Sequence, residues 1–302
     1  MRLSTRLAVA SFLVLGLGCS RPPLPLRQRV ADAYAVHEGV KIHYVTLGHG
    51  PLVVMIHGFP DYWYTWAAQM DALSRDYRIA AIDQRGYNLS DKPQGVANYT
   101  MDKLAGDVLQ VIHDCGETRA ILVGHDWGGM VAWYLAMNHP EAVAKLVVLN
   151  APHPRLLVRE LAHNPVQQQR SEYAQSFLLP GMEQVLMANL DAMTSWIKDP
   201  EEKQTHIDML KRCDFEALLN YYRANYPKKP YQADDSPLAL VKAETLMIHG
   251  LKDPAFAPGT LPGIWQAMAT DITVMTVPDA GHWVHRDAEK LVTRTMRAWL
   301  GR

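Results

Sequence analysis

The segment 124–129, with the sequence Gly-His-Asp-Trp-Gly-Gly, restricts the possible folds of this chain more than any other part of it. It lies between a short apolar run, 120–123, and a stretch of helical composition that continues to Asn138. A strand, one tight turn and a helix would hold the Asp126 side chain above the strand end, and small residues at Gly124 and Gly128 are needed because the turn leaves no room for a Cβ atom. The alternative is that Asp126 caps the helix that follows it.

The same succession of strand, polar loop and helix recurs along the chain. Short apolar or β-branched runs at 52–56, 78–82, 146–149, 243–249 and 272–277 each precede a polar loop. This alternation predicts an α/β fold, in which a mostly parallel sheet has helices on both faces. The alternation stops between Pro154 and about Ser236, where Gln, Leu, Met and Tyr at helical spacing predict a helical insertion over the strand ends.

Three residues that could act together follow three of the predicted strands. Asp126 follows the first of these strands, Asp253 follows the strand 243–249, and His282 follows the strand 272–277. Alone, Asp253 would be taken for a loop or cap residue and His282 for an ordinary loop histidine. Their order along the chain, nucleophile, acid and then histidine, predicts a catalytic triad at one edge of the sheet.

A fourth loop, His57-Gly58-Phe59-Pro60, follows the strand 52–56. If that strand lies beside the one that carries Asp126, the backbone amides of Phe59 and Trp127 point to one place and form an oxyanion hole. The loop could equally be a turn that needs Gly58 and Pro60, with His57 hydrogen-bonded inside it, and both interpretations can hold together.

The chain resembles the α/β-hydrolase-fold epoxide hydrolases over nearly all of residues 35 to 300, although dehalogenases share several of the motifs. The resemblance is carried by the residues 57–60, 63–66, 83–87, 124–129, 133–134, 150–154 and 281–283. It implies an α/β-hydrolase fold with a helical cap inserted after the sixth strand. The expected organisation is a signal or lipoprotein segment 1–19, a linker 20–37, a first core part 38–153, the cap 154–236 and a second core part 237–302.

Aspartate at the position of the nucleophile indicates the type of bond that is broken. Attack on an ester or amide would form an anhydride, whereas attack on an sp³ carbon that bears oxygen or halide forms a stable alkyl ester. Asp126 therefore argues against esterase and protease activity. It favours cleavage of an epoxide, which would give a vicinal diol, or of a carbon–halogen bond. In either case His282, oriented by Asp253, activates the water that releases the ester.

Two tyrosines of the insertion favour an epoxide over a halide, because an alkoxide leaving group needs a proton donor and a halide does not. The resemblance implies that Tyr173 and Tyr222 both direct their hydroxyls at the epoxide oxygen; the alternative is that they only pack the cap on the core. The neighbouring Tyr221 would face another side of its helix. We further expect the substrate pocket to be lined by His57, Trp66 and Phe177.

Two other functions stay open. A haloalkane dehalogenase would use the same nucleophile and triad, and an inactive hydrolase fold could serve only for binding. The dehalogenase is the main alternative, since Trp127 would serve either chemistry. The complete triad, the oxyanion loop and the tyrosine pair argue against an inactive fold. The sequence does not identify the epoxide, its stereochemistry or the oligomeric state.

The charge balance and the spacing of possible metal ligands argue against further classes of function. Lys and Arg number 30 against 31 Asp and Glu, so no general attraction to nucleic acid is expected. Neither a cofactor nor a metal ion is expected, because no zinc pattern occurs and His282 and His285 lack a further ligand at suitable spacing. The partner is therefore expected to be a small epoxide alone.

The first nineteen residues indicate export to the bacterial cell envelope. A positively charged start is followed by an apolar run, 7–17, and then by Gly18-Cys19-Ser20. This is the layout of a secretory signal, and Cys19 after a small residue is similar to a lipoprotein cleavage site. A plain signal peptide or a retained anchor is the alternative, so membrane attachment through lipidated Cys19 is one expectation among these.

Overall fold

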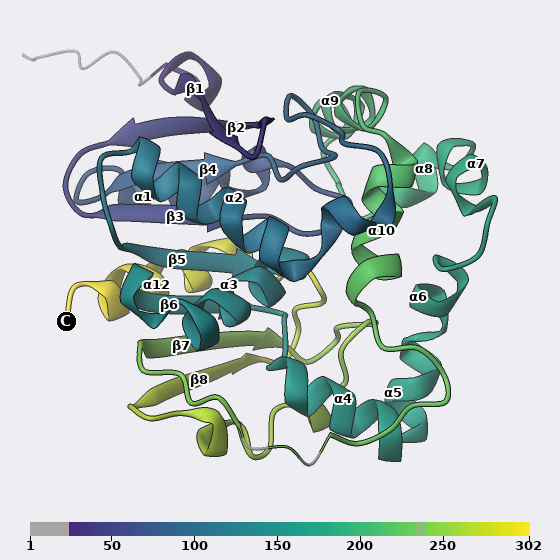
Figure 1. The fold of residues 1–302 in the computed structure, drawn as a ribbon. Helices are drawn as coiled ribbons and strands as arrows, with labels where there is room; N and C mark the ends of the chain where they lie inside the picture. The colour runs from purple at the N-terminus through teal and green to yellow at the C-terminus, as the bar shows by residue number, and fades with distance from the viewer. Residues whose placement is uncertain (1–23, 235, 237) are drawn as a thin grey trace, which may run out of the picture.

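The computed structural model describes residues 24–234, 236 and 238–302, so the expected signal segment lies outside the described residues. One eight-stranded sheet organises the fold, in the order β1-β2-β4-β3-β5-β6-β7-β8 (Figure 1). The strands are β1 (Ala31–His37), β2 (Val40–Gly48), β3 (Leu52–Ile56), β4 (Arg78–Ile82), β5 (Ala120–His125), β6 (Val143–Leu149), β7 (Glu244–Gly250) and β8 (Ile272–Val277). β2 is antiparallel to both β1 and β4, and all other pairs are parallel.

Helices cover both faces of the sheet, as expected for parallel strands. Every residue of β3 and of β5 is buried, because helices lie above and below these central strands. α2 (Met101–Asp114) and α3 (Trp127–Asn138) pack together on one face, and α1 (Ala67–Leu73) and α12 (Glu289–Leu300) pack together on the other (Figure 1). This arrangement confirms the predicted fold class.

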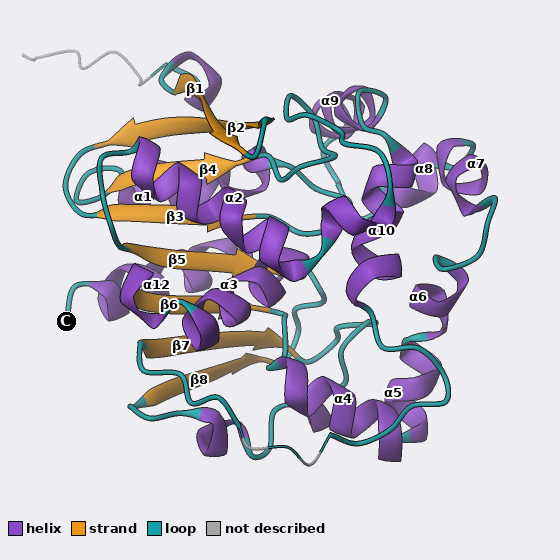
Figure 2. Ribbon diagram, viewed as in Figure 1, coloured by secondary structure: helices purple, strands orange, loops and turns teal. Residues whose placement is uncertain are grey.

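The helical insertion lies over the carboxyl ends of the parallel strands. Figure 2 shows helices and loops but no strand between β6 and β7 in the part of the chain that the structure describes. Its helices are α4 (Pro154–His163), α5 (Pro165–Arg170), α6 (Glu172–Ser176), α7 (Met182–Met187), α8 (Leu190–Met193), α9 (Pro200–Leu210) and α10 (Phe215–Asn225). These helices occupy residues 154–225 of the range expected to form the cap, and from here on the cap means these residues.

Several short helices complete the described chain. They are η1 (Leu26–Gln28), η2 (Trp63–Trp66), η3 (Val96–Tyr99), η4 (Pro140–Ala142), η5 (Pro258–Thr260), η6 (Ile264–Ala267) and α11 (Val284–Asp287). None of the helices in the described ranges is long and apolar enough to cross a membrane.

The predicted linker, 20–37, is wrong in its last seven residues, which form a strand. β1 occupies Ala31–His37 and pairs along its whole length with β2. The pairing is possible because Glu38 and Gly39 both have positive φ, 49° and 82°, which closes a two-residue hairpin turn. Only Ala35 of β1 is fully buried, so this edge strand carries little of the apolar pattern by which a strand is recognised.

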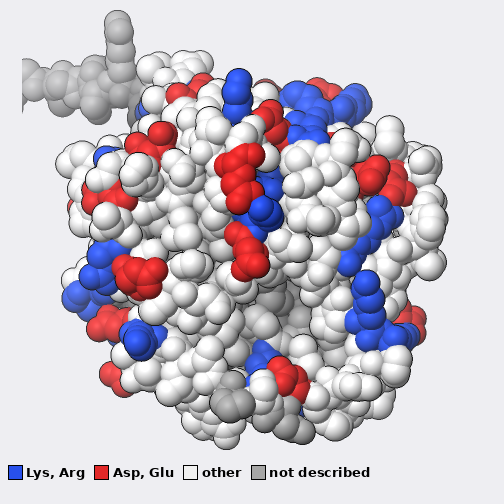
Figure 3. All heavy atoms as spheres, viewed as in Figure 1, with Lys and Arg blue, Asp and Glu red and all other residues white. Residues whose placement is uncertain are grey.

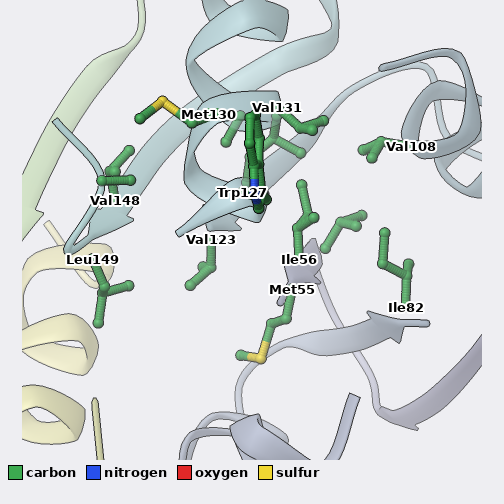
Figure 4. Close-up of a cluster of buried hydrophobic side chains, with 14 of the residues drawn as sticks. Met55, Ile56, Ile82, Val108, Val123, Trp127, Met130, Val131, Val148 and Leu149 are labelled. Atoms are coloured by element: carbon green, nitrogen blue, oxygen red, sulfur yellow. The ribbon is translucent and has the colours of Figure 1, made fainter. Parts of the chain in front are cut away.

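The core around the turn between β5 and α3, which carries Asp126, is apolar and closely packed. Figure 4 shows Trp127 and Val131 of α3 against side chains of the central strands, among them Ile56 and Val123. These contacts fix where α3 begins relative to β3 and β5. The surface is different, since positive and negative side chains are interspersed over the face shown in Figure 3 and the net charge is −1.

Candidate active site

Asp126 occupies a sharp turn between β5 and α3. Its φ of 51° and ψ of −123° are rare for a residue with a side chain, so the surrounding structure must impose them. A Cβ atom at Gly124 would lie 2.4 Å from the carbonyl oxygen of Gly128, and one at Gly128 would lie 2.1 Å from that of Ile56. Glycine at these positions thus allows the close approach that places the Asp126 carboxylate at the strand end.

The three predicted triad residues meet at the carboxyl ends of β5, β7 and β8. Nδ1 of His282 lies 3.0 Å from Oδ2 of Asp253, and its Nε2 lies 3.5 Å from Oδ2 of Asp126. Asp253 is fully buried, while Asp126 and His282 are 5% and 7% exposed. The imidazole therefore lies between the two carboxylates, with contact to a cavity left only at Asp126 and His282.

Hydrogen bonds hold the carboxylate of Asp253 at both oxygens. Oδ1 accepts from the amides of Ala255 and Phe256, at 2.7 and 3.1 Å. Oδ2 accepts from Nδ2 of Asn150 at 2.6 Å, in addition to the contact with His282. Asn150 is itself fixed, because its Oδ1 accepts from the amide of Gly250 at 3.1 Å. Asp253 is therefore an ionised, immobile group that orients the imidazole.

The charges of the triad stabilise one another. Burial alone would lower the pKa of His282, but the charge of Asp253 and the proximity of Asp126 raise it to about 10. Burial would likewise raise the pKa of Asp253, yet the charge of His282 and the bond from Asn150 lower it to about 2. The pKa of Asp126 is lowered against its burial by His282 and by the amide of Phe59. At neutral pH the site therefore holds an imidazolium between two carboxylates.

Of the two amides expected to form an oxyanion hole, one touches the carboxylate of Asp126. The amide of Phe59 donates to Oδ1 at 2.8 Å. The amide of Trp127 begins α3 beside Asp126 but donates no hydrogen bond to this carboxylate in the structure. Oδ1 is therefore the oxygen held by the loop 57–60, and Oδ2 faces His282.

Tyr173 of α6 and Tyr222 of α10 lie together over Asp126. Their ring centroids are 6.3 Å apart, and both residues line the two cavities that reach Asp126. Burial raises the pKa of each well above 10, so both hydroxyls keep their protons at neutral pH. Neither hydroxyl donates a hydrogen bond to another described residue, although the indole of Trp127 interacts with the Tyr222 hydroxyl and offsets part of the rise in its pKa. Tyr221, the next residue on α10, donates to the carbonyl oxygen of Arg85 at 2.8 Å. The structure thus separates Tyr222 from Tyr221 as expected.

Two mainly apolar cavities meet at Asp126. The first, of about 250 Å³, lies between α3 and α4 and is lined by Met101, Asp126, Trp127, Met130, Tyr134, Met137, Pro154, Leu157, Val158, Tyr173, Tyr222, Asn225, Tyr226, Pro227 and Phe256. The second, of about 320 Å³, is lined by Phe59, Pro60, Asp126, Tyr173, Phe177, Leu186, Ala192, Met193, Ser195, Trp196, Tyr222, Pro254, Ala255, His282 and Trp283. Asp126, Tyr173 and Tyr222 border both cavities, so a bound apolar molecule would present its central atoms to them.

The expectation for the pocket wall needs correction at two of its three residues. Phe177 lines the second cavity and packs against Phe59, with the two ring centroids 5.4 Å apart. His57 is fully buried and lines neither cavity, because its ring is engaged with the backbone of Gly58 and Gln84. Trp66 is also fully buried away from the cavities and stacks on His285, with the two ring centroids 4.7 Å apart. Both residues support the loops behind the site instead of lining it.

Sequence reasoning assigned no role to two residues that hold the triad. Asn150 fixes Asp253 as described above; its sequence signals are its place directly after β6, at the same sheet edge as the triad, and the motif 150–154 that it begins. His125 donates from Nε2 to the carbonyl oxygen of His282 at 2.9 Å. Burial and the nearby His282 lower the pKa of His125 to about 4, so it is a neutral support for the histidine loop. Within the described ranges no group of three His, Cys, Asp or Glu is placed to hold a metal ion.

Comparisons with known proteins agree with this geometry. The family model of the alpha/beta hydrolase fold matches residues 51–289. Epoxide hydrolase 3 of Xenopus tropicalis is 33% identical over 87% of this chain and 75% of its own length. Epoxide hydrolase 1 of Caenorhabditis elegans is 34% identical over 87% of this chain and 68% of its own length. A crystal structure of a variant of an epoxide hydrolase from Bacillus megaterium is 31% identical and covers 89% of this chain and 100% of that one, with a TM-score of 0.83.

Proposed function

Because the chain belongs to the α/β-hydrolase fold family, and within it to the epoxide hydrolases, we propose that it opens an epoxide through a covalent ester on Asp126 and releases a vicinal diol. The observation that carries this proposal is the position of the Tyr173 and Tyr222 hydroxyls, which donate to no other described residue, at the cavities that share the Asp126 carboxylate. An aspartate nucleophile and two proton donors are the groups that ring opening requires.

In the first step Oδ2 of Asp126 attacks a ring carbon of the epoxide. Oδ1 is held by the amide of Phe59, so Oδ2 is the oxygen free to form the new bond. The carbon–oxygen bond of the ring breaks, and the departing oxygen takes a proton from Tyr173 or Tyr222. The product is a hydroxyalkyl ester of Asp126 and a tyrosinate.

Formation of the ester changes the state of His282. One of the two carboxylates that raise its pKa has become neutral, so the pKa falls and the imidazolium can lose its proton. Loss of this proton balances the proton that the tyrosinate regains. The charge of Asp126 thus determines when His282 becomes a base, since His282 is a cation before the attack and neutral after the ester has formed.

In the second step neutral His282 takes a proton from water, and the oxygen of that water attacks the carbonyl carbon of the ester. The developing negative charge on Oδ1 is stabilised by the amide of Phe59, an effect that typically contributes about 3–4 kcal/mol for one donor. Collapse of this intermediate breaks the bond to the alkyl oxygen, which takes the proton from His282. The second proton of the water then passes from the Asp126 carboxyl to His282, so the diol leaves with the Asp126 carboxylate and the imidazolium both restored.

Haloalkane dehalogenation remains the alternative, because the nucleophile and triad would be the same. Tyrosine hydroxyls support the epoxide, since a halide leaves without a proton. The test is a panel of styrene oxide, 1,2-epoxyoctane and trans-stilbene oxide beside 1-chlorohexane and 1-bromohexane, with diol and free halide both measured. The proposal expects diol from at least one epoxide and no halide release; halide release without diol would overturn it.

We also propose that the segment 1–19 directs the protein to the bacterial cell envelope and that Cys19 becomes lipidated. The composition of the segment supports this, although it lies outside the described residues. Expression of the full chain in a bacterium, with Cys19→Ala as the matched variant, tests it. The unaltered protein should appear in the membrane fraction with a mass that includes the lipid and lacks residues 1–18, and recovery of an intact, unmodified chain would contradict the proposal.

A further inference from the structure

The loop that carries Asp253 is held by the cap as well as by the core. This loop, 253–257, contains the amides that donate to Oδ1 of Asp253, so its backbone position determines where the carboxylate lies. Two side chains of α5 reach it, from a helix that lies some ninety residues earlier in the sequence.

Gln167 is the more deeply buried of the two, with none of its surface exposed. Its Nε2 donates to the carbonyl oxygen of Ala255 at 2.8 Å, and its Oε1 accepts from the amide of Ala257 at 2.8 Å. One amide side chain therefore satisfies a backbone acceptor and a backbone donor of the same loop. These two bonds fix the loop in one register relative to α5.

Arg170 lies one turn further along α5 and reaches the same loop. Its Nη1 donates to the carbonyl oxygen of Asp253 itself, and it lies 3.4 Å from the carbonyl oxygen of Phe256. The backbone of the triad acid is thus held from the cap, while its carboxylate is held from the core by Asn150.

The same short stretch of the cap continues to the tyrosine pair. Nε2 of Gln167 also donates to Oγ of Ser171 at 3.0 Å, and Tyr173 follows two residues later in α6. A single segment, 167–173, therefore contacts the loop of the triad acid at one end and provides a proposed proton donor at the other. Displacement of α5 would move both.

We propose that Gln167 and Arg170 are positioning residues, which hold the loop 253–257 and the Asp253 carboxylate where hydrolysis of the covalent ester requires them. The inference rests on the proposed function, because it assigns these residues to its second step. Attack by Asp126 needs the tyrosines and the Phe59 amide, whereas ester hydrolysis needs His282 oriented by Asp253. Loss of either contact should therefore slow hydrolysis more than alkylation.

The test compares Gln167→Leu with Gln168→Leu, a matched change on the same helix. Gln168 donates only to the carbonyl oxygen of Leu161, within the cap. Rapid-quench experiments with styrene oxide, followed by intact-protein mass spectrometry, give the rates of ester formation and ester loss separately. Gln167→Leu should lose the ester about 10- to 100-fold more slowly and accumulate it, while Gln168→Leu should behave as wild type.

Variants of Arg170 test the inference independently, and they keep it testable if a Gln167 variant does not fold. Arg170→Met should slow ester loss in the same way, and Arg170→Lys should restore much of the rate because its ammonium can donate to the same carbonyl. Gln167→Glu retains the acceptor for Ala257 and replaces Gln167→Leu if that variant is unfolded.

The outcomes separate the inference from the proposed function. If the wild-type enzyme forms no ester with any epoxide of the panel, the proposed function fails and this inference fails with it. If wild type forms and hydrolyses the ester but the Gln167 and Arg170 variants match Gln168→Leu, only the inference fails. Equal slowing of both steps would also overturn it, because these residues would then merely hold the cap on the core.

Discussion

Oδ2 of Asp126 lies 3.5 Å from Nε2 of His282, so the nucleophile and the proposed base are in contact before any substrate arrives. The other side of the imidazole is held by Asp253, at 3.0 Å. The pKa of His282 is raised by both carboxylates, so its charge depends on that of Asp126. In the proposed mechanism this relationship orders the two steps, because the base becomes available only after the nucleophile has reacted.

The first prediction concerns the pKa of His282. In the free enzyme it is raised to about 10, so His282 should be protonated throughout neutral pH. Asp126→Asn removes the charge that alkylation would also remove, and the pKa should fall by at least about one unit. NMR titration of the His282 ring in both proteins measures this, and an intact mass confirms that the amide is retained. Equal pKa values in the two proteins would contradict the proposed control of the base.

The second prediction concerns the tyrosines. Tyr173→Phe and Tyr222→Phe should each slow ester formation about 100-fold or more, and the double variant should open no epoxide. Neither hydroxyl donates a hydrogen bond to another described residue, so Tyr173→Phe should alter the free energy of unfolding by less than about 0.5 kcal/mol. Tyr222→Phe also removes the interaction with the indole of Trp127 and should cost up to about 1 kcal/mol.

Tyr221→Phe is the matched control for this pair. It removes the buried hydrogen bond to the carbonyl oxygen of Arg85 and should destabilise the fold by about 1–3 kcal/mol, with ester formation unchanged. Rapid-quench rates and urea unfolding curves provide both measurements. Wild-type activity in the double variant would remove the tyrosines from the mechanism.

The buried strands and the tight turn at Asp126 could be predicted, because both depend on the local pattern of apolar residues and glycines. Apolar runs such as Leu52–Ile56 and Arg78–Ile82 identify buried strands, and the glycines around Asp126 permit only a tight turn. β1 was missed because most of its side chains are exposed, so it lacks a buried face. Its remaining signal was Glu38-Gly39, a turn pair directly before β2, which begins at Val40.

The supports of the site could not be predicted in the same way. Asn150 and Gln167 act through partners that lie 103 and 88 residues away along the chain, respectively, and only the folded sheet and cap bring them together. His57 and Trp66 illustrate the opposite error. Both occur in motifs near the site, but hydrogen bonding and ring stacking turn them away from the cavities.

The third prediction concerns Gly58, in the loop that faces the nucleophile. A Cβ atom at this position would lie 2.3 Å from Cβ of Asp126 and 2.4 Å from its Oδ1. Gly58→Ala should therefore displace the carboxylate or the Phe59 amide and slow ester formation about 100-fold or more.

Gly116→Ala is the control for this change, since Gly116 has positive φ, at 77°, but no atom near its added Cβ. It should cost about 1 kcal/mol of stability through backbone strain alone and leave the rates unchanged. If Gly58→Ala also kept the wild-type rate of ester formation, the close packing of the loop against Asp126 would have no part in catalysis.

The central claim is that Asp126 forms an ester with an opened epoxide, and a mass measurement on His282→Gln tests it most directly. This variant keeps the nucleophile, the Phe59 amide and both tyrosines but lacks the base, so the ester should form with styrene oxide and persist. Peptide mapping should then find the peptide that contains Asp126 heavier by the whole mass of the epoxide, with Asp126→Asn unmodified under the same conditions. Diol release from His282→Gln at the wild-type rate, or an adduct on any residue other than Asp126, would contradict the account.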